Sequence, residues 1–265
     1  MTRTQGQSRK NTDRHADISA RLFLEAVLPS LDVLLQYSPK AQSIIGIQDF
    51  VLRLSVTGCG SQTYHFENER LTVAAKPCQP HLHLHFQSAH DLQKLLHGQL
   101  PTIPHIEFPQ NFCPSLLPVL PLLLLQLDRA LKPPLSEAAL LLHLRLLLSI
   151  AYKALPHLAQ HDPETRQILA HTPPGILHIQ LAKTDIRAWA NWDGQTLTTS
   201  TSDRPPRFPD AQITFLDPLI AYHTFNETLD THAAIGLHRL IIEGHLPLAD
   251  HFSLLLERLP HFLPK

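Results

Sequence analysis

Histidine is the residue type that most invites a chemical role in this chain, since it contributes 19 of the 265 residues. His81, His83 and His85 alternate with apolar residues in HLHLHF, so in a strand their side chains share one face. Neutral imidazoles at that spacing could ligate zinc or copper. The corresponding positions of a similar later segment, 210–215, hold Asp, Gln and Thr, which are ordinary residues for a solvent-facing side. We therefore predict no metal site.

The sequence contains none of the common catalytic motifs. The chain lacks G-x-S-x-G, H-E-x-x-H, a phosphate loop and G-x-G-x-x-G. Cys59 lies between two glycines in an expected turn, and no cation close in sequence would activate its thiol. We predict a protein that is not an enzyme and has no cofactor. Because a triad can assemble from distant residues, an enzyme with an undetected site stays a third alternative.

Composition narrows the class of partner. Charged residues make up 17% of the chain and hydrophobic residues 43%, so apolar surface is plentiful and charge is scarce. The net charge of -1 provides no basic stripe, which argues against nucleic acid. Cys59, Cys78 and Cys113 form no C-x-x-C pair, which favours a reducing compartment, and we expect a cytoplasmic location.

Two segments differ in character from the rest of the chain. Residues 1–16 are polar, without the apolar core of a secretory signal, and we predict a disordered tail there. Leucine supplies 18 of the 43 residues between 113 and 155. Ser136 is a good N-cap for a helix to about Gln160, and the leucines of that helix cover nearly every side. Such a helix is normally buried all round.

Strand patterns occur in two blocks. In the first block, apolar residues alternate with polar ones, a helix broken at Pro29 precedes the strands, and Ser88 caps a helix that follows them. In the second block, Asp193-Gly194 predicts a hairpin and Asp217 caps a helix. The strands are expected at 52–56, 64–66, 71–73 and 81–86, then at 177–181, 190–192, 211–216 and 237–244, with a final helix at 248–259.

The two blocks have the same order of features, which predicts an internal repeat. Phe86 pairs with Phe215, and Ser88 with Asp217, at an offset of 129 residues. Phe66 pairs with Trp192, and Leu71 with Leu197, at an offset of 126 residues, and the longer second linker absorbs the difference. We expect Trp192 in the core and Trp189 on the opposite face, where it could contact a partner or a membrane interface.

The second block resembles the sterol-carrier-protein-2-like family. The resemblance lies in AWANWDGQTLTT, in ITFLDPLIAYHTF and above all in AAIGLHRLIIEGHLPLADHFSLLL, with Gly236 and Gly244 at the family's two glycine positions. The first block matches through FENERLTV and HLHLHFQSAHDLQKLLHG but has no clear glycine–strand–glycine segment after Gly98. The resemblance implies α+β units, each a mainly antiparallel sheet covered by helices around an apolar tunnel for lipids.

We therefore predict an α+β protein with two sterol-carrier-like units joined by a leucine-rich helical segment. The expected boundaries are 1–16 for the tail, 17–112 for the first unit, 113–165 for the leucine-rich segment and 166–265 for the second unit. The second unit, which has the complete pattern, is the better candidate for ligand binding. The first unit, with the leucine-rich helices, is expected to be its degenerate partner.

The predicted function is carriage of an apolar ligand, such as a fatty acid, a sterol or an isoprenoid or quinone-like molecule. The alternative is a scaffold with filled cores, whose leucine-rich helices form a homodimer or dock a protein partner, as an accessory factor in lipid or quinone metabolism. Contact with a membrane surface is also compatible with the composition. The candidate cavity-lining residues, which could equally be plain core, are Leu84, Phe86, Leu95, Ile213, Phe215, Phe225, Leu240 and Ile242.

Overall fold

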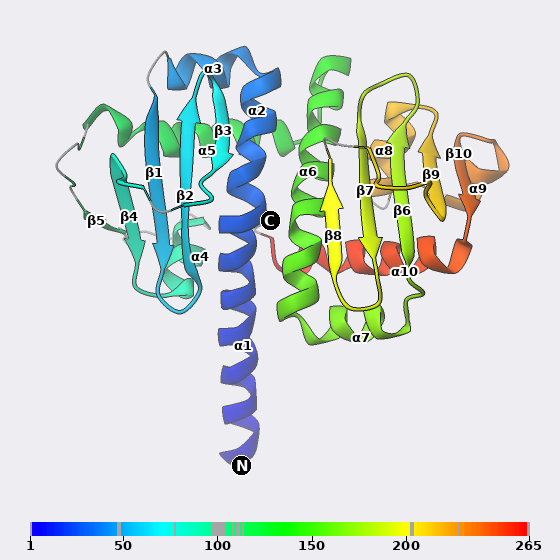
Figure 1. Ribbon diagram of the computed structural model, residues 1–265, viewed down its shortest axis with the longest axis horizontal. Helices are drawn as coiled ribbons and strands as arrows, with labels where there is room; N and C mark the ends of the chain where they lie inside the picture. Colours follow the sequence, from blue (N-terminus) through cyan, green and yellow to red (C-terminus); the bar gives the residue numbers. More distant parts are fainter. Residues whose placement is uncertain are drawn as a thin grey trace. The chain divides into compact units, whose positions relative to one another are not determined.

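The computed structural model divides the chain into two compact units. Unit 1 comprises residues 1–129 together with 260–265, and unit 2 comprises residues 130–259. The residues that the structure describes are 2–46, 49–76, 78–96, 104–107, 109, 112, 114–201, 204–226, 228–229 and 231–263, with the backbone alone for 2–11, 231 and 232. Each unit is an α+β fold with its own five-stranded sheet (Figure 1).

Unit 1 begins with helices and continues into its sheet. The helices before the sheet are α1 (Thr2–Leu22), the π-helix η1 (Phe23–Val27), the 3-10 helix η2 (Leu28–Ser30), α2 (Leu31–Tyr37) and α3 (Pro39–Ile45). The strands are β1 (Phe50–Val56), β2 (Gly60–Glu67), β3 (Arg70–Val73), β4 (Leu82–Phe86) and β5 (His105–Glu107). The remaining helices are α4 (Ala89–Leu96), η3 (Pro114–Leu116) and α5 (Val119–Leu131).

Sheet 1 has the strand order β3-β2-β1-β4-β5, and only the central pair β1–β4 is parallel among its four pairs. The alternation seen in the sequence sets its two faces. Every second residue of β1 and β4 is buried, including Leu52, Leu54 and Phe86, while the residues between them are half-buried. Phe50 and Phe66 stack at 4.3 Å across the β1–β2 pair and extend the core toward β3.

Helix α1 begins before the helix predicted from residue 17, because residues 2–16, expected to be a tail, have helical backbone. Most side chains from Ala16 to Leu22, at the end of α1, are buried. Asp17 accepts a hydrogen bond from the Cys59 thiol, and Arg21 donates to the Gly58 carbonyl, which fixes α1 to the β1–β2 turn. Composition alone missed these long-range contacts.

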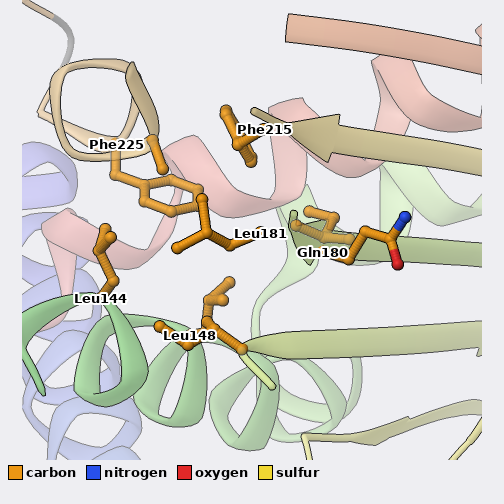
Figure 2. Close-up of a pocket in the computed structure, with 9 residues that line it drawn as sticks. Leu144, Leu148, Gln180, Leu181, Phe215 and Phe225 are labelled. Atoms are coloured by element: carbon orange, nitrogen blue, oxygen red, sulfur yellow. The ribbon is translucent and has the colours of Figure 1, made fainter. Parts of the chain in front are cut away.

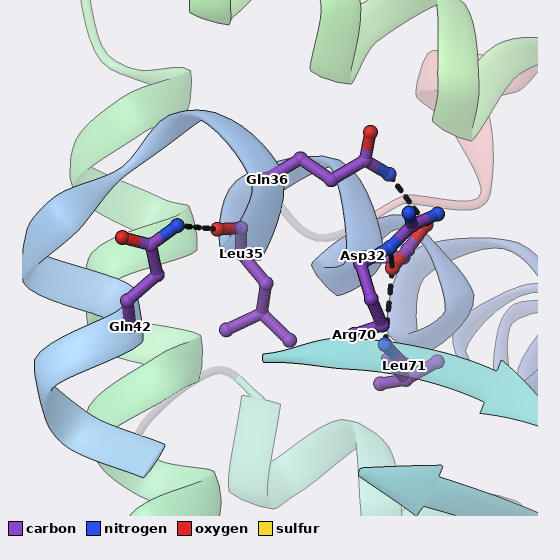
Figure 3. Close-up of polar contacts among 6 residues, drawn as sticks. All are labelled: Asp32, Leu35, Gln36, Gln42, Arg70 and Leu71. Atoms are coloured by element: carbon purple, nitrogen blue, oxygen red, sulfur yellow. Dashed lines mark hydrogen bonds and ion pairs between the residues drawn. The ribbon is translucent and has the colours of Figure 1, made fainter. Parts of the chain in front are cut away.

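The carboxylate of Asp32 joins α2 to β3 (Figure 3). It accepts hydrogen bonds from Arg70 Nε at 2.9 Å, from the Leu71 backbone at 3.0 Å and from Gln36 at 2.7 Å. Burial raises the pKa of Asp32, but the hydrogen bonds from Arg70 and Leu71 outweigh it and the net pKa is lowered. An ionised Asp32 therefore holds the helices before the sheet against the edge strand.

Unit 2 has helices on both sides of its strands in the sequence. The strands are β6 (Gly175–Leu181), β7 (Arg187–Trp192), β8 (Leu197–Ser200), β9 (Ala211–Phe215) and β10 (Leu240–Gly244). The helices are α6 (Glu137–His161), α7 (Pro163–His171), α8 (Pro218–Phe225), α9 (Thr231–Gly236) and α10 (Leu246–Glu257), followed by the 3-10 helix η4 (Leu259–His261) at the unit boundary. Ser136 and Asp217 cap α6 and α8 as predicted.

Sheet 2 has the order β10-β9-β6-β7-β8, which is the order of sheet 1 read from the other edge. Its central pair, β6–β9, is again parallel. Phe66 pairs with Leu71 in sheet 1, and Trp192 pairs with Leu197 in sheet 2, so the residues aligned in the sequence have equivalent registers. β5 occupies the place of β10 but is only three residues long. The common topology agrees with the predicted repeat, whose origin stays a prediction.

One face of sheet 2 carries the core of unit 2. Its inward side chains pack against α6, α7, α8, α9 and α10, and Phe252 and Leu155 are fully buried there. As expected, Trp192 is buried, and its indole N–H donates to the Thr172 carbonyl at 3.1 Å. Trp189, on the opposite face, is half-buried. In Figure 1, α6 runs beside β8 at one edge of the sheet.

The leucine-rich segment is not a separate body, which differs from the expected boundaries. The division between the units falls after Arg129, so most of α5 belongs to unit 1 while α6 and α7 belong to unit 2. Within the described residues, Pro114–Leu131 and Glu137–His161 are long and apolar enough to cross a membrane by composition. In unit 2, however, α6 places Leu144, Leu148 and Leu155 in the core. Packing on sheet 2 therefore accounts for much of its leucine content.

Candidate apolar ligand site

The parallel strands β6 and β9 position the inner face of unit 2. Their register places Ile179 opposite Ile213 and Leu181 opposite Phe215. The chain then leaves β9 through the Asp217 cap, whose carboxylate accepts from the Leu219 backbone at 2.7 Å. This cap starts α8 beside the end of β9, so that the inner side of α8 faces the last residues of both strands.

A hollow with about 10 Å³ of free space, which is about what one water molecule requires, lies between these strand ends, α6 and α8. Phe215 and Phe225 form one wall, with ring centroids 5.4 Å apart and planes inclined by 59°. Figure 2 shows Leu144 and Leu148 of α6 facing Leu181 and the Phe225 ring. The full lining is Leu144, Leu148, Ile179, Gln180, Leu181, Ile186, Phe215, Ala221 and Phe225.

The hollow presents hydrocarbon rather than polar groups. Gln180 is the one polar residue in its lining, and the Gln180 amide is turned away from the aromatic rings in Figure 2. That amide donates to Thr214 Oγ1 at 3.1 Å instead. The lining can therefore exclude water and make dispersion contacts, but it supplies no side-chain acid, base or nucleophile.

A buried histidine lies beside this hollow on α6. The Nδ1 of His143 donates to the Ala130 carbonyl at 3.0 Å, and its ring meets Tyr222 edge to face at 5.3 Å. Burial lowers the pKa of His143, although the hydrogen bond to Ala130 opposes this shift. His143 is therefore neutral at physiological pH.

The structure brings two of the eight predicted site residues into the hollow, Phe215 and Phe225. Leu240 and Ile242 of β10 pair with Phe215 and Ile213, so they lie on the neighbouring strand rather than at the lining. The three residues predicted from the first block are in unit 1, where Leu84 and Phe86 are buried in β4 and Leu95 is partly exposed on α4. Their contact with a ligand stays a prediction.

Sequence reasoning missed the contribution of α6. Leu144 and Leu148 line the hollow from within the leucine-rich helix, and Ile186 reaches it from the turn before β7. The spacing of four residues between Leu144 and Leu148 places them on one face of α6. Because leucines occur on nearly every side of the helix, the sequence did not reveal which face meets the sheet.

We expected the histidine face of β4 to be an ordinary solvent-facing side without a metal site. No group of three His, Cys, Asp or Glu side chains in the described part of the chain is arranged to hold a metal ion. The face is less open than an ordinary solvent-facing side, because the His83 side chain is only 15% exposed. Cys59 is buried, and burial together with Asp17 raises the pKa of its thiol to about 11, so the thiol is protonated at neutral pH.

The similarity of this chain to known proteins lies in its fold. No family model and no curated protein matches the chain. The solved structures similar to it include the UbiJ-SCP2 ubiquinone synthesis protein, at 9% identity and a TM-score of 0.32 over 40% of this chain and 89% of that one. Sterol carrier protein domain 2 of Helicoverpa armigera matches at 16% identity and a TM-score of 0.33 over 42% and 87%. The inverting sec-alkylsulfatase Pisa1 from Pseudomonas sp. matches at 11% and 0.27 over 54% and 30%.

Proposed function

We propose that unit 2 binds an apolar, lipid-like molecule between sheet 2, α6 and α8, and that this site is not catalytic. The observation that carries the proposal is the hollow at the ends of β6 and β9, whose lining offers hydrocarbon and no reactive side chain. Apolar pockets with few polar groups are typical of sites for small apolar ligands. A fatty acid, a sterol and an isoprenoid or quinone-like molecule all have the required chemistry.

The hollow is too small to hold a lipid chain without a change in the structure. Pockets for small molecules usually enclose roughly 300–1,000 Å³, whereas the free space between α6 and α8 is only about 10 Å³. A lipid chain therefore has to displace a wall. The wall that can be displaced most easily is α8, because this helix is only eight residues long and Leu219 at its start is 54% exposed. Outward movement of Phe225 with α8 would lengthen the hollow along α6.

Displacement of a fluorescent fatty acid tests this proposal. Ala221→Leu fills part of the hollow from α8, whereas Ala89→Leu makes the same change at a buried alanine of α4 in unit 1. Each added side chain costs about 1–3 kcal/mol of stability, so both variants are first checked for folding. We expect Ala221→Leu to weaken binding by about tenfold, equivalent to 1.4 kcal/mol, and Ala89→Leu to leave it unchanged. Equal affinities in the two variants, or no binding by the wild type, would contradict the proposal.

A second candidate function is a scaffold with filled cores, favoured by the small hollow and by apolar side chains on the surface. Leu122 and Leu125 of α5 are each more than 40% exposed, and Leu135 is fully exposed. Such residues suit a protein partner, a second copy or a membrane surface. Sedimentation of the purified protein distinguishes this candidate, because a monomer at all concentrations would contradict self-association. A reducing compartment is part of either proposal, and Cys59 and Cys78 are free thiols.

A further inference from the structure

A row of hydrogen-bonded polar side chains crosses the face of sheet 1 that lies opposite its core. Ser55 comes from β1, His83 and His85 come from β4, and Glu107 comes from β5. The β1–β4 register places Ser55 beside His85, and the β4–β5 register places His83 beside Glu107. Three strands that are distant in sequence thus bring a hydroxyl, two imidazoles and a carboxylate together within one unit.

The distances form a continuous relay. Glu107 Oε2 lies 2.5 Å from His83 Nδ1, and the other nitrogen of His83, Nε2, lies 2.8 Å from Ser55 Oγ. On the other side of Ser55, His85 Nδ1 is 2.8 Å from the same Oγ, and His85 Nε2 is 3.3 Å from Thr57 Oγ1. Both imidazoles therefore use both ring nitrogens, and Ser55 lies between them.

The ionised carboxylate of Glu107 determines which atom donates and which accepts in each hydrogen bond of the relay. The hydrogen bond from His83 lowers the pKa of Glu107, so Glu107 is an acceptor at neutral pH. His83 must then carry its proton on Nδ1, which leaves a lone pair on Nε2 to accept the Ser55 hydroxyl proton. His85 in turn donates from Nδ1 to Ser55 Oγ. Each hydrogen bond of the relay thus has its donor on the side away from Glu107 and its acceptor on the side nearer to Glu107.

Unit 2 shows that the fold does not require these residue types. The equivalent positions of β6 and β9 hold Gln180, Gln212 and Thr214, whose side chains hydrogen-bond to one another at 3.1 and 3.2 Å. Glu243, opposite Gln212 in the β9–β10 register, corresponds to Glu107. An amide and hydroxyl network is thus sufficient for this face of the sheet, whereas unit 1 has a serine and two histidines there.

From this arrangement we propose that Ser55, His83 and Glu107 form a nucleophilic relay that cleaves activated carboxylic esters. A nucleophile hydrogen-bonded to a base that a third group orients is the arrangement by which such sites are recognised, independent of sequence order. Ser55 is the nucleophile, His83 is the base, and Glu107 is a positioning residue. This activity is separate from ligand binding by unit 2 and would make the chain an enzyme despite its lack of motifs.

The chemistry balances with water as the second reactant. Ser55 Oγ forms a bond to the ester carbonyl carbon while its proton passes to His83 Nε2. The bond from that carbon to the leaving oxygen then breaks, and the alcohol leaves with the proton from His83. Water attacks the acyl-serine in the same way, which releases a carboxylic acid and restores Ser55. The net reaction converts an ester and water into an acid and an alcohol.

The surroundings limit the substrate to esters with good leaving groups. The backbone N–H groups beside Ser55 belong to the pairings of β1 with β2 and β4, so side chains must stabilise the negative oxygen of the intermediate. His85 Nδ1, released when Ser55 Oγ bonds to the substrate, is the nearest donor on this face, because the Thr57 hydroxyl proton is engaged by His85 Nε2 or by the Phe86 carbonyl. With one side-chain donor, we expect slow turnover of aryl esters and covalent capture of Ser55 by fluorophosphonates.

Labelling of the full-length protein with a fluorophosphonate, followed by peptide mass spectrometry, tests the relay directly. We expect one phosphonyl adduct on Ser55, and none in Ser55→Ala. The matched control is Ser61→Ala, because Ser61 is exposed on β2 directly opposite Ser55 and lies outside the relay. An adduct on another residue, or no adduct on the folded wild type, would overturn the proposal.

Hydrolysis of p-nitrophenyl acetate gives the second measurement. We expect Ser55→Ala and His83→Gln to lower kcat/KM by about tenfold or more, since a positioned general base usually contributes at least that much. Glu107→Gln is expected to lower kcat with little effect on KM, and Glu107→Asp to restore part of it. Circular dichroism confirms folding in each case. If Ser55→Ala and Ser61→Ala hydrolyse the ester equally, the activity is background imidazole catalysis and the relay has no catalytic role.

Discussion

Gly244 occupies a position where a side chain has no room, and its replacement by alanine tests the closure of unit 2. Its φ of +85° lies in the left-handed region, and a Cβ there would stand 2.2 Å from the Asp210 carbonyl oxygen. That oxygen already accepts from the His245 backbone at 2.8 Å, and the Asp210 backbone donates to Ile176 at 2.9 Å. The clash is therefore with backbone that joins β6, β9 and the start of α10.

The expected loss of stability has two parts. The left-handed conformation costs a non-glycine residue roughly 1–2 kcal/mol. Displacing packed backbone to relieve the clash costs about 1–3 kcal/mol more. Together these values predict that Gly244→Ala lowers the free energy of unfolding of unit 2 by about 2–5 kcal/mol, a large part of the ~5–15 kcal/mol typical of a domain.

Urea unfolding followed by tryptophan fluorescence is the appropriate assay, because both tryptophans of the chain, Trp189 and Trp192, lie in β7 of unit 2. With a slope of about 2 kcal/mol per molar urea, the midpoint should fall by roughly 1–2.5 M. The control is Gly236→Ala at the end of α9, where a new Cβ would meet nothing within 4 Å. That variant should keep its midpoint, and equal losses in both variants would refute the reasoning.

Three further outcomes are expected. Tyr152→Phe should change stability by less than about 1 kcal/mol in a thermal melt, because the buried Tyr152 hydroxyl has no hydrogen-bond partner among the described residues. Burial lowers the pKa of His143 and His178, so stability should fall as the pH drops below 6.5, and replacing both with Phe should reduce that fall in melts between pH 7.5 and 5.5. Because the pKa of Asp32 is lowered, its contribution should be present above pH 3.8 and lost on further acidification; Asp32→Ala should cost about 1–2 kcal/mol in urea at pH 7.

Local signals in the sequence predicted local structure well. Ser136 and Asp217 cap their helices because the cap depends on residues two or three positions away. The hairpin at Asp193 forms because its carboxylate accepts from the Gln195 and Thr196 backbones. The alignment of Phe66 with Trp192 also predicted equivalent registers, since alternation fixes which residues face the core.

Features that depend on distant segments were beyond such reasoning. The polar chain from Ser55 to Glu107 arises from pairing between β1, β4 and β5, and no single segment contains the pattern. Helix α1 was predicted only from residue 17, and its contacts with the β1–β2 turn through Asp17 and Arg21 could not be read from the sequence. The hollow required knowing which side of α6 meets sheet 2, and leucine on all sides of that helix concealed it.

Residues 260–265 return to unit 1, which precedes unit 2 in the sequence. Within unit 1, Phe262 stacks on His15 of α1 with ring centroids 5.0 Å apart. A growing chain presents its N-terminal part first, and domains usually fold in that order. Here unit 1 cannot acquire its complete set of contacts until all of unit 2 has been translated. Unit 1 therefore completes its folding only after unit 2 has been translated.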